Sequence, residues 1–349
     1  MRGRFPSPGV RTGKIDFRFY NASFIIPATM ARRRILGKRF VKAMLPIVLL
    51  IVLATIAVAG WIVKSITRPP RAEYLVTPAT FSQLSGPVLK ATDETWANRD
   101  GTQARGWLIR GAPGAPAVIL YHRYGADRSW LLNLSVKLNE ATNFTVLWPD
   151  LRGHGPGPTV NWTSFGSSEA NDVSAAIDYV RTLKTPSGER QTAEAIGLYG
   201  VELGGYAALA ASSHADVRAL VLDSIPGSPD ALIDATSAAS SGMDNRILRK
   251  LARTGMRAYF LGKYQSAAAC DLARSLQGKR VLLLSGADAG YLRDSTIALE
   301  RCFAPQVTLE TKTDLPLSGL NLPSATGQIG EGYDRRVLDF FDKALRSAP

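Results

Sequence analysis

One carboxylate lies in the tightest strand-to-helix turn that the sequence suggests. The apolar run at 195–199 continues as Gly200-Val201-Glu202-Leu203-Gly204-Gly205 and then as a helical stretch. The glycines on both sides of Glu202 allow a tight turn directly before the helical stretch. A carboxylate there could act as a nucleophile that forms an ester, or as a general acid or base if burial raises its pKa. The chemistry available at this turn is therefore that of Glu202.

Two further turns follow strand-like runs and contain the other polar groups of interest. His122-Arg123-Tyr124-Gly125 follows the run at 117–121, and Pro149-Asp150-Leu151-Arg152-Gly153-His154-Gly155 follows the run at 144–148. The carboxyl ends of parallel strands meet at one edge of a sheet, where ligands bind. These turns and the Glu202 turn are therefore expected at the same edge.

In order and spacing, the three turns resemble those of the α/β-hydrolase superfamily, over about residues 85–347. They correspond to its oxyanion loop, its Asp-x-Arg-Gly-His-Gly turn and its nucleophile elbow. The resemblance implies a doubly wound, mostly parallel sheet and a pocket at Glu202 that includes Arg123, Tyr124 and Leu203. It also implies that Asp150 and His154 are structural.

The residues that perform hydrolysis in that superfamily are changed here. Glu202 stands at the position of the nucleophilic serine, and Arg123 replaces a glycine of the oxyanion loop. Asp288 has the position of the triad acid, with Asp294 as the alternative, but no histidine follows His214. We expect an Arg123–Glu202 ion pair, because an unpaired buried carboxylate is costly.

The segments between the turns have the pattern of an ordered α/β domain, expected over 87–347. Apolar runs alternate with amphipathic helical stretches, which predicts a parallel sheet covered on both faces. The predicted strands are 106–109, 117–121, 144–148, 195–199, 217–222, 280–284 and 307–310. A helical cap insertion is expected at about 228–278. Its basic stripe is either a solvated face or a contact for anionic lipid headgroups, and consists of Arg246, Arg249, Lys250, Arg253 and Arg257.

The N-terminal fifth of the chain has a different composition. The chain has 42 Lys and Arg against 29 Asp and Glu, and residues 1–72 contain 14 of these basic residues and one acid. Residues 73–349 therefore have no net charge, which argues against a nucleic-acid partner. The uncharged run at 43–63 is long enough to cross a hydrocarbon core of about 30 Å.

The heavier basic flank of this run predicts a cytoplasmic leader (1–42), a transmembrane helix (43–63), a linker (64–86) and an extracytoplasmic domain. A cleaved signal peptide is the alternative, because Ala57-Val58-Ala59 has the pattern of a cleavage site. Residues 1–29 are interpreted as disordered or untranslated, with Met30 as a possible start.

The two cysteines have no zinc or redox spacing, and neither a metal nor a cofactor is expected. In an extracytoplasmic domain Cys270 and Cys302 are either a disulfide or two buried thiols.

Two principal functions remain open. The first is a membrane-anchored pseudoenzyme that binds a small acyl-like ligand or a protein partner through the altered pocket. The second is an ester-type hydrolase with an unconventional centre formed by Glu202, Asp288 and, as the substitute base, His122. A third class, a structural envelope protein, requires a pocket filled by side chains. Fold similarity alone does not decide among them.

Overall fold

The computed structural model describes residues 28–71, 73–85, 90–264, 267–324 and 327–346. The chain divides into two compact units after Ile56. The expectations for residues 1–27 lie outside the described residues.

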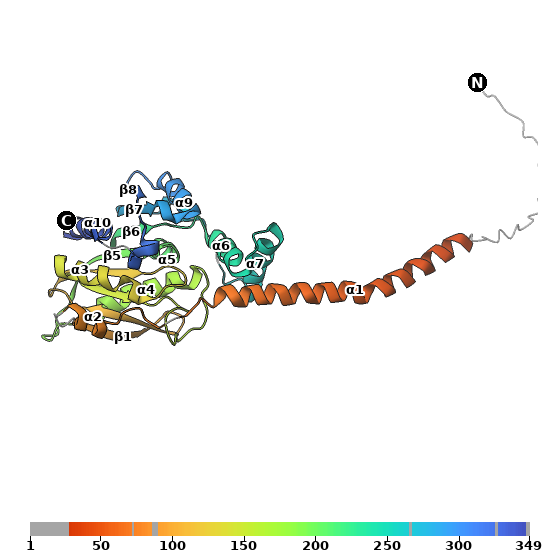
Figure 1. The fold of residues 1–349 in the computed structure, drawn as a ribbon, viewed down its shortest axis with the longest axis horizontal. Helices are drawn as coiled ribbons and strands as arrows, with labels where there is room; N and C mark the ends of the chain where they lie inside the picture. Colours follow the sequence, from red (N-terminus) through yellow and green to blue (C-terminus); the bar gives the residue numbers. More distant parts are fainter. Residues whose placement is uncertain (1–27, 72, 86–89, 265–266, 325–326, 347–349) are drawn as a thin grey trace, which may run out of the picture. The chain divides into compact units, whose positions relative to one another are not determined.

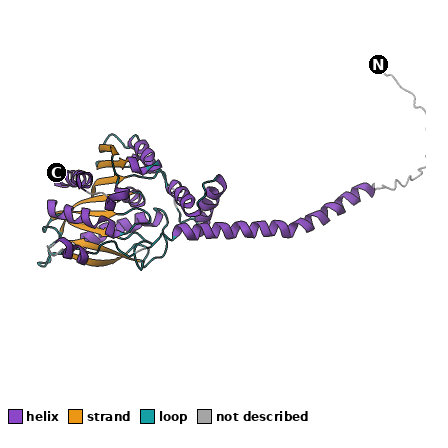
Figure 2. Ribbon diagram, viewed as in Figure 1, coloured by secondary structure: helices purple, strands orange, loops and turns teal. Residues whose placement is uncertain are grey.

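The domain is built on an eight-stranded sheet in the order β1-β2-β4-β3-β5-β6-β7-β8 (Figures 1 and 2). The strands β3 to β8 run parallel, whereas β2 is antiparallel to β4 and β1 is antiparallel to β2. This confirms the predicted doubly wound, mostly parallel sheet. The strands are β1 (Ala91–Ala97), β2 (Gln103–Ile109), β3 (Ala115–Tyr121), β4 (Thr145–Pro149), β5 (Thr192–Val201), β6 (Val217–Asp223), β7 (Arg280–Gly286) and β8 (Thr308–Leu315).

Helices cover both faces of the sheet. This follows from the central strands, whose residues point alternately to the two faces and are apolar on both. In β3, Ile119 and Tyr121 belong to one core, and Val118 and Leu120 belong to the other. The first core is covered by α4 (Ser167–Thr182), α5 (Leu203–Ala211) and α9 (Tyr291–Glu300), and the second by α3 (Leu132–Thr142) and α10 (Gly327–Arg346). Short 3-10 helices, η1 (Arg128–Leu131), η2 (Ala287–Ala289) and η3 (Gly319–Ser324), lie in the loops.

The insertion expected at about 228–278 contains three helices: α6 (Pro229–Ser241), α7 (Arg246–Tyr259) and α8 (Ala269–Arg274). Cys270 of α8 and Cys302 form a disulfide with a Cα–Cα distance of 5.1 Å. The two cysteines are therefore a covalent link between this insertion and the segment that follows α9.

The first helix, α1 (Ala28–Thr67), includes a stretch, Phe40–Thr67, that is long and apolar enough to cross a membrane. The predicted transmembrane helix, 43–63, ends with two residues of the domain core. Ile62 and Val63 are buried in the first core together with Ile66. Trp61, one residue earlier, is 57% exposed. The domain core therefore begins inside the last turns of α1.

The segment predicted as a linker, 64–86, is partly helical in the described residues. Residues to Thr67 continue α1, and α2 (Pro78–Ser85) is a further helix. Tyr74, Val76 and Phe81 pack against the second core. Apolar side chains thus attach this segment to the domain.

Candidate functional site

Glu202 lies between β5 and α5 in a turn that only closely packed glycines permit. Its backbone has φ 49° and ψ −109°, a conformation that L residues rarely adopt. A Cβ on Gly200 would lie 2.5 Å from the backbone of Gly204, and one on Gly204 would lie 2.5 Å from His122 O. The glycines around Glu202 are therefore required by the close approach of β5, α5 and the loop after β3.

The Glu202 carboxylate is held by backbone amides. Tyr124 N–H donates to Oε2 with an N···O distance of 2.8 Å. Burial raises the pKa of Glu202 to about 7, although the N–H groups of Tyr124 and Leu203 and the charge of Arg123 all act to lower it. Since the residue is partly exposed, this carboxyl can exchange protons near neutral pH.

The expected Arg123–Glu202 ion pair is wrong. Within the described ranges, no ion pair joins these side chains. Arg123 Nε instead donates to Leu320 O at 3.0 Å and Nη1 to Tyr124 O at 2.9 Å. The guanidinium also lies over the ring of Trp130, 4.5 Å from its centroid. These contacts direct it toward η3 and η1, so Arg123 affects Glu202 only through its charge.

His122 does not offer a free nitrogen to the site. Nε2 accepts from Leu151 N–H at 3.0 Å, and Nδ1 lies 2.8 Å from Arg123 O, to which it donates. Burial lowers the pKa of His122 to about 4. The neutral imidazole holds two loops together with both of its nitrogens. His122 therefore has no free nitrogen with which to act as a base beside Glu202.

The triad-acid position is occupied, but its contacts are with a serine and an asparagine. Asp288 accepts from Ser318 N at 2.8 Å, from Ser318 Oγ at 3.0 Å and from Asn321 Nδ2 at 2.7 Å. All three histidines of the chain lie in the described ranges, and none has a recorded contact with Asp288. Ser318, in the loop after β8, has the contact that the resemblance assigns to a histidine.

Asp223, at the end of β6, is a second carboxylate that orders this loop. It is buried and accepts from Gly319 N at 2.8 Å, Tyr333 Oη at 2.6 Å and Ser224 Oγ at 2.6 Å. Its carboxylate contacts the loop after β8, and its place at a strand's carboxyl end was the available signal.

The comparisons with known proteins bear on this arrangement. No family model matches the chain. A curated relative, the uncharacterized protein YfhR of Salmonella typhi, is 31% identical over 172 residues, which are 41% of this chain and 52% of the relative. The chain thus spans about half the length of that relative.

Solved structures match a larger part of the chain. The esterase Pf2001 of Pyrococcus furiosus is 20% identical, with a TM-score of 0.57, over 80% of this chain and 99% of the esterase. The α/β hydrolase GrgF of a Penicillium species is 18% identical, with a TM-score of 0.53, over 74% of this chain and 100% of GrgF. This chain has the α/β-hydrolase fold. At these identities the likeness concerns the fold alone.

In this α/β-hydrolase-fold domain the oxyanion loop also contacts α1. Tyr124 Oη donates to Ile66 O at 2.7 Å, and the Tyr124 ring stacks on Phe165 with centroids 5.4 Å apart. Thr163 N–H donates to Thr67 O at 2.9 Å. One residue, Tyr124, therefore contacts both Glu202 and the end of α1, a connection that no sequence signal indicated.

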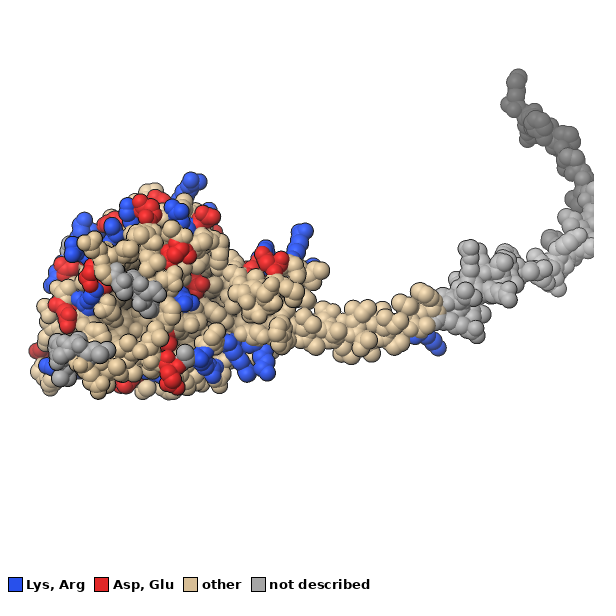
Figure 3. All heavy atoms as spheres, viewed as in Figure 1, with Lys and Arg blue, Asp and Glu red and all other residues tan. Residues whose placement is uncertain are grey.

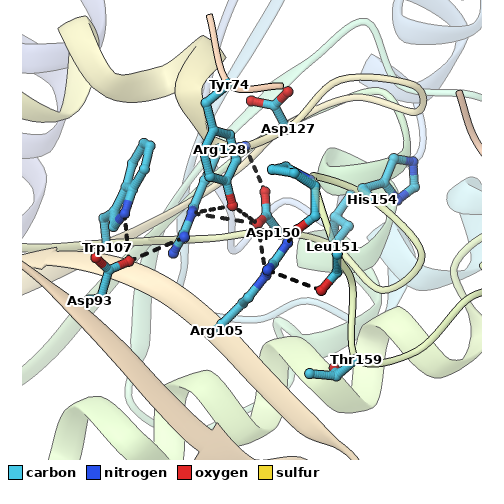
Figure 4. A network of polar contacts seen from close by, with 12 residues as sticks. Tyr74, Asp93, Arg105, Trp107, Asp127, Arg128, Asp150, Leu151, His154 and Thr159 are labelled. Atoms are coloured by element: carbon cyan, nitrogen blue, oxygen red, sulfur yellow. Dashed lines mark hydrogen bonds and ion pairs between the residues drawn. The ribbon is translucent and has the colours of Figure 1, made fainter. Parts of the chain in front are cut away.

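The Asp-x-Arg-Gly-His-Gly turn of the α/β-hydrolase fold has a structural network around Asp150 (Figure 4). Asp150 accepts from Tyr74 Oη at 2.7 Å and Arg128 N at 2.9 Å, and it pairs with Arg105 Nε at 3.3 Å and Arg128 Nε at 3.5 Å. Arg128 Nη2 also pairs with Asp93 of β1 at 3.2 Å. Asp150 thus joins β1, β2, η1 and the segment after α1.

A cavity of about 930 Å³ lies against α4, α5 and the cap. Aromatic side chains contribute to its lining: Trp162, Tyr206, Tyr259 and Phe260. Its volume is within the range of small-molecule sites. In the described part of the chain, no group of three or more His, Cys, Asp or Glu side chains could hold a metal ion.

Proposed function

We propose that this protein is a membrane-anchored, non-catalytic member of the α/β-hydrolase fold that binds a small acyl-like ligand or a protein partner. The observation that carries the proposal is the position of the Glu202 carboxylate. Its Oε2 already lies 2.8 Å from Tyr124 N, the distance at which an oxyanion-hole donor would hold the oxygen of a reacting ester. A substrate carbonyl would have to displace this carboxylate and would meet its negative charge.

The base side of the centre supports the same conclusion. Serine-type hydrolysis needs a histidine that takes and returns a proton. The contacts of Asp288 are with Ser318 and Asn321, and both nitrogens of His122 are engaged elsewhere. An ester formed on Glu202 would therefore lack a positioned base to hydrolyse it.

The ligand side of the proposal rests on the cavity lined by Trp162, Tyr206, Tyr259 and Phe260, which is a different place from the expected pocket, because neither Glu202 nor Arg123, Tyr124 or Leu203 lines it. Its volume suits a small molecule, and its lining combines these aromatic rings with polar side chains such as Asp100 and Lys263. Partner binding is the second form of the same proposal.

The anchor side rests on the apolar stretch Phe40–Thr67 and on the basic residues that precede it. The excess of positive charge before the stretch favours a cytoplasmic N-terminus and an extracytoplasmic domain. The Cys270–Cys302 disulfide fits an oxidising compartment.

One observation favours a second candidate, an ester-type hydrolase that uses Glu202 as a general acid or base. The pKa of Glu202 is raised to about 7, so both protonation states are populated at neutral pH, and the residue is partly exposed.

The two candidates are separated by ester hydrolysis. The full chain in detergent, Glu202→Gln and Glu202→Ser are assayed with p-nitrophenyl esters of two to ten carbons between pH 6 and 8. We expect all three proteins to match the protein-free rate. Turnover by the native chain that is lost in Glu202→Gln establishes the hydrolase instead.

Ligand binding is tested with a fluorescent fatty acid. We expect the native chain to bind it and Ala210→Phe, which fills the cavity, to weaken binding at least tenfold. Ala239→Phe, on the exposed side of α6, is the matched control and should bind as the native chain does. Equal binding by the two variants excludes this cavity as the site.

A further inference from the structure

The cap helix α7 buries one face and leaves a basic and apolar face uncovered. Ala252 and Met256 are fully buried in the first core. At 100° per residue, the opposite side of the helix carries Lys250, Thr254 and Ile247, all of which are exposed. A helix with a strong polar face and apolar residues beside it is typical of the membrane interface.

The charges on α7 fall into two groups. Three arginines are paired with aspartates: Arg249 with Asp244, Arg253 with Asp234 and Arg257 with Asp230. Arg246 and Lys250 have no ion pair among the residues that the structure describes.

Two large apolar side chains lie at the N-terminal end of α7, Ile247 in its first turn and Met243 shortly before the helix. Ile247 is 73% exposed and Met243 is 56% exposed. We call Met243, Arg246, Ile247 and Lys250 the α7 patch. It combines two cationic groups that lack an acidic partner with uncovered apolar surface.

The position of α7 beside α1 indicates what the α7 patch contacts. A Cβ on Gly255 would lie 2.7 Å from Val63 Cγ2 and 3.6 Å from Ala59 O, so α7 contacts the last turns of α1. Figure 1 shows α6 and α7 beside this end of the helix. Trp61 is exposed and Ile62 is buried in the domain core, so the last residues of the candidate span Phe40–Thr67 already belong to the core.

We propose that the α7 patch lies on the anionic headgroups of the membrane that α1 spans. The absence of a spacer between Trp61 and the core places any helix that contacts Ala59 and Val63 at headgroup level. There, Arg246 and Lys250 meet lipid phosphates, and Met243 and Ile247 enter the boundary of the acyl chains. This inference rests on the proposed membrane anchor.

The test uses the full chain in vesicles of phosphatidylcholine, with and without one quarter phosphatidylglycerol. Ile247→Cys carries an environment-sensitive fluorophore, which reacts only there because both native cysteines form the disulfide. Brominated lipids report contact with the acyl boundary. We expect at least twofold stronger quenching in the anionic vesicles, reduced to the neutral-vesicle value by 0.5 M salt, as screening requires.

Matched variants separate the effect of the α7 patch on quenching from the effect of the protein's net charge. Arg246→Glu with Lys250→Glu should abolish the difference between the two vesicles. Arg335→Glu with Arg336→Glu, exposed residues of α10, changes the net charge equally and should retain it. A fluorophore at Thr308→Cys, on the edge strand β8, should be unquenched in both vesicles.

The outcomes distinguish the inference from the anchor beneath it. A chain that floats with vesicles after alkaline washing but shows equal quenching in both lipids retains the anchor and overturns the α7 inference. A chain that leaves the vesicles overturns the anchor, and the α7 inference with it.

Discussion

Asp150 and Glu202 are carboxylates at the same edge of the sheet, after β4 and β5, and they are satisfied in opposite ways. Asp150, with a side chain only 3% exposed, has two guanidinium partners, a tyrosine hydroxyl and a backbone amide. Glu202 has backbone amides and, in the described part of the chain, no ion pair. Burial raises the pKa of both, but only at Asp150 do ion pairs oppose it directly.

This difference separates a carboxylate that links several segments of the fold from a carboxylate held by one turn and the loop beside it. The Asp150 network connects distant segments and matches the structural role that the resemblance implies. The Glu202 turn keeps the strained backbone of a nucleophile elbow while its side chain occupies the neighbouring amide donors. Strained backbone of this kind clusters at functional sites, which makes Glu202 the candidate of the two.

The largest effect should come from Asp150→Asn. Removing this charge takes away the acidic partner of Arg105 and leaves Arg128 with Asp93 alone, and breaking a buried pair costs about 3–5 kcal/mol. Urea denaturation of the full chain in detergent measures the loss. Asp342→Asn breaks a surface pair with Arg346 and should cost under about 1 kcal/mol. Similar losses in both variants would remove the distinction between the Asp150 network and an ordinary surface pair.

The second prediction concerns the part of the pH dependence of stability that is due to Glu202. Because the folded pKa of about 7 lies above the ordinary value of 4.5, the folded chain binds more protons than the unfolded chain between these values. Glu202 therefore makes the free energy of unfolding fall as pH rises from about 4.5 to 7, by at most about 3.5 kcal/mol at ~1.4 kcal/mol per pKa unit.

Glu202→Gln should remove this part of the pH dependence. The measurement is the difference in unfolding free energy between the native chain and the variant at pH 5 and pH 8. That difference isolates Glu202 from other buried carboxyls such as Asp223, whose pKa is also raised. A difference that does not change with pH contradicts the raised pKa.

Much of the fold could be predicted from the sequence because both faces of the central sheet are buried. Apolar runs predicted the strands β3 to β7, and the glycines around Glu202 predicted the turn. The edge strand β8 (Thr308–Leu315) is mostly polar, and only its start was predicted, at 307–310. β1 (Ala91–Ala97) was missed, since it is an edge strand of mostly polar residues with one buried side chain, Trp96. Zero net charge over 73–349 agrees with Figure 3, where acidic and basic side chains mix over the visible face.

The contacts of the site were less predictable than its positions. The resemblance singled out Asp288, but the contacts of Asp288 with Ser318 and Asn321 depend on a loop without a recognisable sequence pattern. The Arg123–Glu202 pair was expected from charge alone, yet the guanidinium follows the carbonyl of Leu320 and the face of Trp130. A long side chain has several partners within reach, and tertiary packing chooses among them.

The smallest predicted effect tests whether the end of α1 depends on the oxyanion loop. Tyr124→Phe removes the hydroxyl that donates to Ile66 O and keeps the ring on Phe165, so it should cost about 1 kcal/mol. Tyr206→Phe is a matched change, because Tyr206 Oη donates to Ala267 O at 2.9 Å, away from α1.

Hydrogen exchange distinguishes these two tyrosines where global stability does not. Tyr124→Phe should speed exchange at Thr163, whose N–H donates to Thr67 O, while Tyr206→Phe should leave it unchanged. The Tyr124 N–H is kept, so the pH dependence due to Glu202 should persist in Tyr124→Phe. If that dependence changes as well, the end of α1 and the Glu202 carboxylate are energetically coupled through Tyr124, and the contrast between scaffold and site no longer holds at this residue.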